Sequence, residues 1–212
     1  MKGHVDEMRL ATGAMAILGI SVAVLVVMPY LLLRDVPAPA ALKPYSAEQL
    51  RGRQVYIANG CVYCHSQQPR DVGLAPDALR GWGRASVAAD YHFDQPHLLG
   101  TMRTGPDLFN IAARQPSDDW HLGHLYQPRA YTAGSTMPGF PFLFTEQTTP
   151  SSPGQKAINL PPAYAKPGVT VLPTQDARDL VAYLLALDHT YAVIESPKSL
   201  EPVASGTKGS TP

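Results

Sequence analysis

Cys61-Val62-Tyr63-Cys64-His65 is the stretch that decides the fold of this 212-residue chain. In a C-x-x-C-H run, two thiols three residues apart can add to the two vinyl groups of one porphyrin, and the adjacent histidine can reach its iron. The motif therefore predicts one covalently bound haem c. Cys61 and Cys64 would be its thioether anchors, and His65 would be an axial ligand of the iron.

A C-x-x-C pair also occurs in redox-active dithiols and in zinc sites, but zinc would need two further ligands. The chain has no third cysteine. His121 and His124 lie three residues apart, so they would share one face of a helix. With no evident third and fourth ligand, structural hydrogen bonding or a subunit contact is favoured for them over a metal site.

An uncharged run covers residues 10–33. As a helix rising about 1.5 Å per residue it would be about 36 Å long, which is enough to cross a bilayer with some tilt. A cleaved signal peptide is the alternative, because small residues follow at 38–40, but a signal core has only about 7 to 15 apolar residues. We therefore predict a retained transmembrane anchor at 10–33, after a cytoplasmic segment at 1–9.

Small residues repeat along one face of this predicted anchor, at Thr12, Ala16, Gly19 and Ala23. Such a seam lets another transmembrane helix approach closely, although small residues are also common in membrane helices generally. Basic residues flank the run on both sides, so they do not set its orientation. Bacteria attach haem c outside the plasma membrane, which predicts that the residues after the anchor lie on the periplasmic or external side.

The remaining chain predicts a linker at 34–45, one mono-haem domain at 46–190 and a disordered tail at 191–212. Ser46 and Gln49 form a capping-box pattern at the start of a helix that leads into the haem motif. Thr174 would cap a last helix over 175–188. In cytochrome c folds the first and last helices cross, and Gly52 and Tyr183 are expected to meet there.

Two methionines beyond the motif compete for the sixth position of the iron, and a methionine there suits electron transfer. Met137 lies in a proline-stiffened stretch far enough along the chain to wrap over the opposite haem face, whereas Met102 is followed directly by Arg103. We predict Met137 as the second axial ligand. The carbonyl of Pro106 is predicted to accept a hydrogen bond from His65 and so to orient its imidazole.

Seventeen basic and seventeen acidic residues give a formal net charge of zero, so no nucleic-acid surface is predicted. Residues 145–173 are rich in proline, threonine and serine, which predicts an inserted surface loop within the domain.

Three longer stretches resemble the membrane-anchored mono-haem subunit II of cbb3-type cytochrome c oxidases. They are GRQVYIANGCVYCHSQQPR (52–70), RGWGRASVAADYHFDQPHLLGTMRTGPDLFNIAARQPSDDWHLGHLYQPR (80–129) and STMPGFPFL (135–143). The resemblance implies an all-α fold, with one transmembrane helix followed by a class I cytochrome c-like domain. By matching position it implies the thioether anchors already named and His65 with Met137 as axial ligands.

The same resemblance implies a role in respiration without catalysis by this chain itself. Electrons would pass from a di-haem cytochrome c subunit or a soluble cytochrome c through the haem c to the haem b of a catalytic haem-copper subunit, which reduces oxygen. The chain would lie in the bacterial plasma membrane, and residues 120–129 would be a contact region.

Three alternatives stay open. A membrane-tethered cytochrome c shuttle, or the cytochrome c subunit of a nitric-oxide reductase, would share the plan of one anchor and one haem. An enzyme or sensor that binds a ligand at the iron would need an open or displaceable sixth position.

Overall fold

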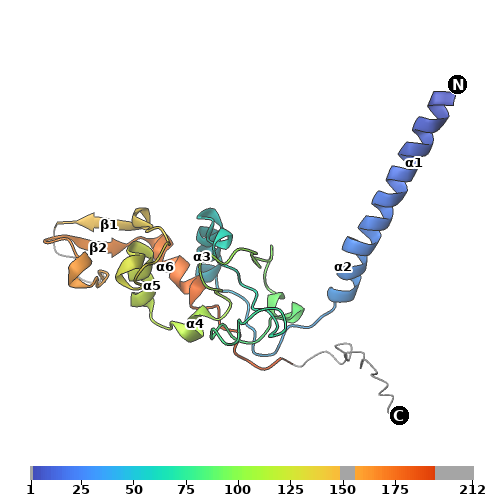
Figure 1. Cartoon of the computed structure of the whole chain (residues 1–212). Coiled ribbons are helices and arrows are strands. Elements are labelled where there is room, and N and C mark those ends of the chain that lie inside the picture. Colours follow the sequence, from blue (N-terminus) through green and yellow to red (C-terminus); the bar gives the residue numbers. More distant parts are fainter. Residues whose placement is uncertain (1, 149–155, 194–212) are drawn as a thin grey trace, which may run out of the picture.

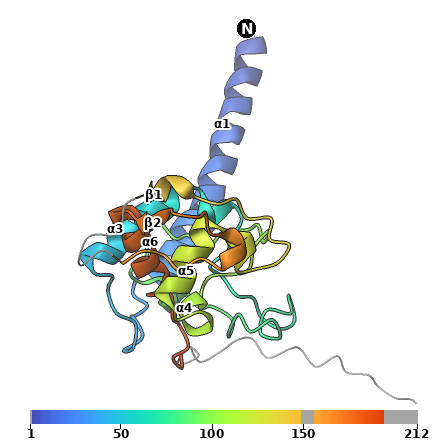
Figure 2. The same cartoon turned by 90° about the vertical axis from the view of Figure 1, so that its left-hand side faces the viewer.

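In the computed structural model, residues 2–148 and 156–193 are described, and they form a long N-terminal helix followed by a mostly helical domain. Figure 1 shows the helix standing clear of the domain, and in Figure 2 its N-terminal part projects beyond the domain. This arrangement confirms the predicted fold class of a membrane anchor joined to a cytochrome c-like domain. The limits of the linker and the haem domain stay predictions, and the tail lies outside the described residues from 194 onward.

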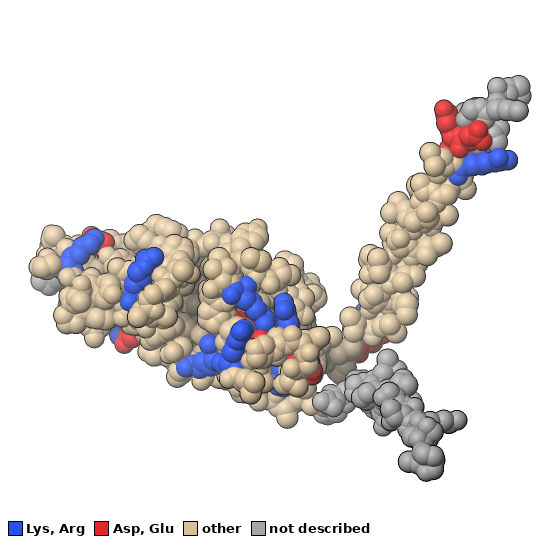
Figure 3. Space-filling view, in the orientation of Figure 1, with Lys and Arg blue, Asp and Glu red and all other residues tan. Residues whose placement is uncertain are grey.

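The N-terminal helix consists of α1 (Lys2–Val22), a π-helical segment η1 (Ala23–Val27) and α2 (Met28–Leu33). Residues Asp6–Leu33 are long and apolar enough to cross a membrane. Figure 3 shows acidic and basic side chains near the free end of this helix and an uncharged surface along the rest of it towards the domain. Pro29 lies two residues after the end of the π segment. In an α-helix its ring would clash with the carbonyl four residues earlier, which belongs to Leu25 inside this segment, and the wider π turn accommodates it.

The first helix of the domain, α3 (Ala47–Ala58), begins as predicted. The Ser46 hydroxyl accepts a hydrogen bond from the backbone N–H of Gln49 at 3.2 Å, and the Gln49 side chain accepts one from the backbone N–H of Ser46 at 2.9 Å. This reciprocal pair satisfies two backbone donors at the start of the helix. The capping-box prediction is confirmed.

The last helix, α6 (Gln175–Leu184), also begins at its predicted cap, since Thr174 accepts from the N–H of Ala177. It ends four residues earlier than the prediction of 188. Beyond Leu184 the chain tightens into three-residue turns, and the carbonyl of Leu187 accepts from the N–H of Ala112 at 3.2 Å. Leu187 extends the helical spacing of apolar residues in the sequence because it is buried, but it lies in the turn that follows the helix and not in the helix itself.

Helices α3 and α6 pack against each other, as Figures 1 and 2 show. The predicted meeting of Gly52 with Tyr183 stays a prediction. A side chain at position 52 would overlap the backbone carbonyl of Asp179, one turn earlier on α6. Tyr183 packs against the ring of Tyr56, edge to face at 5.5 Å between centroids. Glycine is needed at position 52 because the backbones of the two helices come into contact there.

Between these helices the chain forms α4 (Ile111–Arg114), α5 (Asp118–Tyr126) and short 3₁₀ turns. Strands β1 (Phe144–Gln147) and β2 (Thr170–Pro173) pair in antiparallel register from Phe144 opposite Pro173 to Gln147 opposite Thr170. The core lies between α3, α5, α6 and this hairpin. Its members include Tyr56, Leu122, Leu125, Phe144, Val171, Leu180, Val181 and Leu184.

The segment at 145–173 is therefore not a surface loop throughout. Both of its ends are strands, and Val171 and Leu172 are buried in the core. Ile158 is buried as well, and its N–H donates to the carbonyl of Val171 at 2.9 Å. The high proline, serine and threonine content concealed these few apolar residues. Residues 149–155 lie outside the described part.

Candidate functional site

The haem-type motif lies directly after α3. Gly60 turns the chain with φ of 65°, a left-handed conformation that favours glycine, and η2 (Cys61–Tyr63) follows as one 3₁₀ turn. The N–H groups of Cys64 and His65 both donate to the carbonyl of Cys61, at 3.1 and 3.0 Å. The two cysteines and the histidine therefore share one tight turn. Cys61 is half-buried and Cys64 is exposed.

Burial raises the pKa of the Cys61 thiol to about 11, and nearby Cys64 adds to this effect. At neutral pH the sulfur is therefore a thiol and not a thiolate. Redox-active dithiols depend on a lowered thiol pKa. The environment of Cys61 thus disfavours the dithiol interpretation. No group of three or more metal-binding His, Cys, Asp or Glu side chains occurs among the described residues.

The His65 ring is fixed from two directions. Its Nδ1 lies 2.8 Å from the carbonyl oxygen of Pro106, which can only accept, so Nδ1 carries the proton. Burial lowers the pKa of His65, and the hydrogen bond to Pro106 opposes this shift. The ring is therefore neutral at pH 7, with an unprotonated Nε2 that can act as a metal ligand.

Gly105 lies against the flat face of this ring. A Cβ atom at position 105 would overlap Cε1 of His65 and approach its Nδ1 to 2.7 Å and its Nε2 to 2.8 Å. The N–H of Gly105 also donates to the carbonyl of Cys64 at 2.9 Å. Residue 105 must therefore be a glycine for the imidazole to keep this orientation. The sequence analysis missed this role.

Gly100 supports the same segment from another side. It has φ of 66°, and a side chain there would come within 2.9 Å of the carbonyl oxygen of His65 and 3.1 Å of that of Val62. The backbone of the haem-type motif can only approach residue 100 this closely because no Cβ is present. Gly100 was also missed, because nothing local in the sequence links it to a motif 35 residues earlier.

Met137 lies partly buried against the hydrophobic core. Its backbone N–H donates to the hydroxyl of Ser135 at 3.2 Å, and the N–H of Phe140 donates to the carbonyl of Leu125 on α5 at 2.8 Å. The segment is thus fastened to α5 just beyond the methionine. Met102, the competing methionine, is 58% exposed. The ligand role of Met137 stays a prediction.

Two buried nitrogen atoms near His65 lack a hydrogen-bond partner among the described residues. They are Nδ1 of His124 and Nε of Arg114. Burial lowers the pKa of His124 to about 4, with the charges of His121 and His65 contributing. The charge of Arg114 likewise acts on His65. Buried polar atoms are normally satisfied, so these nitrogens fit a cofactor that presents polar groups at this place.

The two histidines of α5 behave differently. His121 is buried, and its Nε2 hydrogen-bonds the carbonyl of Gln115 at 2.8 Å. His124 instead stacks on Trp120, with 4.6 Å between ring centroids and 13° between planes. His121 thus has the structural contact that was favoured for it, whereas His124 keeps an unsatisfied nitrogen.

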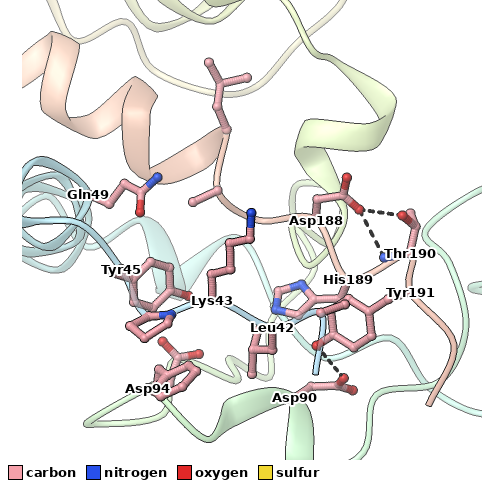
Figure 4. A pocket seen from close by; sticks show the side chains of 15 residues that line it. Leu42, Lys43, Tyr45, Gln49, Asp90, Asp94, Asp188, His189, Thr190 and Tyr191 are labelled. Carbon is pink, nitrogen blue, oxygen red and sulfur yellow. Dashed lines mark hydrogen bonds between the residues drawn. The ribbon is translucent and has the colours of Figure 1, made fainter. Parts of the chain in front are cut away.

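A cavity of about 550 Å³ lies elsewhere, between the linker and the chain after α6. Figure 4 shows Lys43 and Tyr45 on the linker side, with Asp188 and Tyr191 on the other. The Tyr191 hydroxyl donates to Asp90, and Thr190 donates to Asp188. Neither the cysteines of the motif nor its histidine lines this cavity. It is therefore separate from the predicted haem site.

The family described as cytochrome C oxidase, mono-heme subunit/FixO matches residues 4–162. This range extends beyond the predicted resemblance at both ends and includes the apolar helix. No curated protein matches the chain.

Proposed function

The chain belongs to the family of mono-haem subunits of cytochrome c oxidase (FixO), and from that membership we propose that it is the electron-entry subunit of a cbb3-type oxidase. It would receive electrons from a di-haem cytochrome c subunit or a soluble cytochrome c. It would pass them to the haem b of the catalytic haem-copper subunit. Members of this family are accessory mono-haem subunits of the oxidase. Oxygen reduction would belong to the catalytic partner.

Each site residue has a distinct task in this proposal. Cys61 and Cys64 would form the thioether bonds, while His65 and Met137 would be the residues that ligate the iron. A haem c held in this way supplies reversible one-electron transfer, and thioether ligation favours a higher potential than a second imidazole. The Pro106 carbonyl would hold the proton of His65 on Nδ1, so that Nε2 stays free for the iron.

One observation carries this proposal. The C-x-x-C-H motif places a neutral histidine whose Nδ1 is bound to Pro106 and whose ring face is covered by Gly105. A histidine with only a packing role has no need of an oriented and unprotonated Nε2. Supporting contacts of this kind are typical of histidines that ligate metals.

The anchor would keep the haem domain at the membrane surface on the periplasmic or external side of a bacterial plasma membrane. Support comes from the apolar helix at Asp6–Leu33 and from the short linker between it and α3. A short linker limits how far the domain can move from its anchor. This favours a bound subunit over a roaming shuttle.

The test is mild detergent extraction of the native chain, identification of the subunits that co-purify, and a reduced-minus-oxidised haem spectrum. We expect haem c on this 22.8 kDa chain together with haem b and a large haem-copper subunit. A Cys61→Ala variant should lose normal haem attachment and stable assembly. Recovery of a fully active Cys61→Ala complex would contradict the proposal, and a lone haem c chain without haem b would favour the tethered shuttle.

A further inference from the structure

A buried hydrogen-bond network lies next to His65 and has no place in the function described so far. Asp77 and Asp107 are fully buried, and the side chain of Arg103 is only 13% exposed. Charged side chains are rarely buried unless they are paired. Removing these charges from water costs free energy that their mutual attraction often does not recover. Stabilisation of the fold alone is therefore a weak explanation for the network.

The network begins with a second contact in register with the His65–Pro106 hydrogen bond. One residue further along each segment, the Ser66 hydroxyl donates to Oδ2 of Asp107 at 2.6 Å. The N–H of Leu108 donates to the carbonyl of Ser66 at 2.8 Å. The segments that supply the imidazole and its acceptor are therefore aligned by bonds on adjacent residues.

Arg103 joins this pair to the rest of the site. Its Nε donates to the Ser66 hydroxyl oxygen at 3.0 Å, its Nη2 donates to the carbonyl of Gln68 at 2.8 Å, and its Nη1 donates to Oδ1 of Asp77 at 2.7 Å. The guanidinium lies over the Trp82 ring, 5.2 Å from its centroid. One planar guanidinium thus binds both the side chain of Ser66, which follows His65, and the backbone of Gln68 two residues further on. The three bonds come from three different nitrogens of a planar fork, and a lysine, whose three donors sit on one compact nitrogen, could not reproduce this geometry.

We propose that Arg103, acting through Ser66 and Asp107, is a positioning residue that sets the orientation of the His65 imidazole and thereby the electronic state of the haem iron. This inference rests on the proposed function, because it requires His65 to be an iron ligand. The effect is indirect, because the side-chain hydrogen bonds of Arg103 go to Ser66, Gln68 and Asp77. It would pass to His65 through the backbone of residues 65–68 and 105–108.

The test uses the full chain, purified in detergent with its co-purifying subunits, and measures the low-spin EPR signal of ferric haem c and its midpoint potential. Ser66→Ala removes one hydroxyl and leaves the three charged side chains, Arg103, Asp77 and Asp107, in place. We expect haem content as in the wild type, with shifted g values and a raised potential, because a looser His65–Pro106 hydrogen bond makes the imidazole a weaker donor.

Arg103→Lys keeps the charge but loses the fork of donors, so we expect its g values to be shifted as well. The matched control is Arg84→Lys. Arg84 makes a similar partly buried pair, with Nη2 2.7 Å from Oδ1 of Asp90, but it has no hydrogen bond to residues 64–68 or 105–108. The control should keep the wild-type g values even where it lowers thermal stability.

Wild-type g values and potential in both Ser66→Ala and Arg103→Lys would overturn the inference. Should Arg103→Lys fail to accumulate, the Ser66→Ala result decides alone, since loss of one hydroxyl leaves the fold intact. Failure of the proposed function has a different signature. In that case the wild-type chain itself would carry no covalent haem.

Discussion

Gly105 is the residue on which the orientation of His65 depends most directly. Replacing it by alanine would place a Cβ into the imidazole face, so the ring must turn or move away from Pro106. We expect Gly105→Ala to keep the covalent haem but to lower oxidase turnover about tenfold or more, in the range for loss of contacts that support a metal ligand. The measurement is oxygen consumption per haem c, together with the haem spectrum.

Gly73→Ala is the matched control for this substitution. A Cβ at position 73 would meet only Oδ1 of the exposed Asp71, at 3.3 Å, and that side chain can move. Turnover in this control should be unchanged. Equal turnover in both variants would show that the glycine at 105 does not protect the orientation of His65.

Met137 allows a separate test at the same scale. Met137→His should lower the midpoint potential, because imidazole stabilises ferric iron more than a thioether does, and turnover should fall while the haem stays attached. Redox titration of haem c measures this. The exposed Met102 offers the comparison, and Met102→His should leave the potential unchanged. A changed potential in Met102→His alone would reverse the assignment of the sixth ligand.

At the scale of elements, the crossing of α3 and α6 has almost no free space. Gly52→Ala would force a Cβ into the backbone of Asp179, which cannot swing away as a side chain would. We expect a loss of about 3 kcal/mol in the free energy of unfolding, near the top of the range for overpacking. Thermal unfolding of the detergent-purified chain measures it, and the exposed Gln54→Ala on the same helix should change little. A Gly52→Ala protein as stable as Gln54→Ala would contradict the close approach.

The same crossing carries an ion pair that predicts a pH dependence. Nε of Arg51 lies 2.6 Å from Oδ2 of Asp179, and this hydrogen bond lowers the pKa of Asp179. The resulting stabilisation is complete above the ordinary carboxyl pKa of about 3.9 and is lost as the pH falls through the lowered value. Asp179→Asn should therefore be less stable than the wild type at neutral pH, with a difference that shrinks as the pH falls below the ordinary carboxyl pKa of about 3.9. A constant difference in melting temperature across that range would rule this out.

Local chemistry decided how much of the molecule could be predicted. Capping residues fixed the starts of α3 and α6, because a cap satisfies neighbouring backbone groups. The end of α6 and the β1–β2 hairpin depend on contacts with distant segments, such as Leu187 with Ala112. The site divides in the same way. The C-x-x-C-H motif and the Pro106 acceptor were evident from the sequence, whereas Gly100, Gly105 and Arg103 act only once two distant segments lie together.

At the scale of the whole molecule, the anchor and the domain predict a definite topology. Under the proposed function, haem c attachment outside the plasma membrane would place the domain after residue 34 on the external side, with the N-terminal charges inside. Lys156 and Lys166 report on the domain, because their side chains are 65% and 61% exposed. In intact spheroplasts, a membrane-impermeant amine reagent should label both of them. Lys2, before the span, should be labelled only after permeabilisation, which serves as the internal control. Labelling of the two domain lysines only after permeabilisation would place the domain inside and would exclude haem attachment on the outer side.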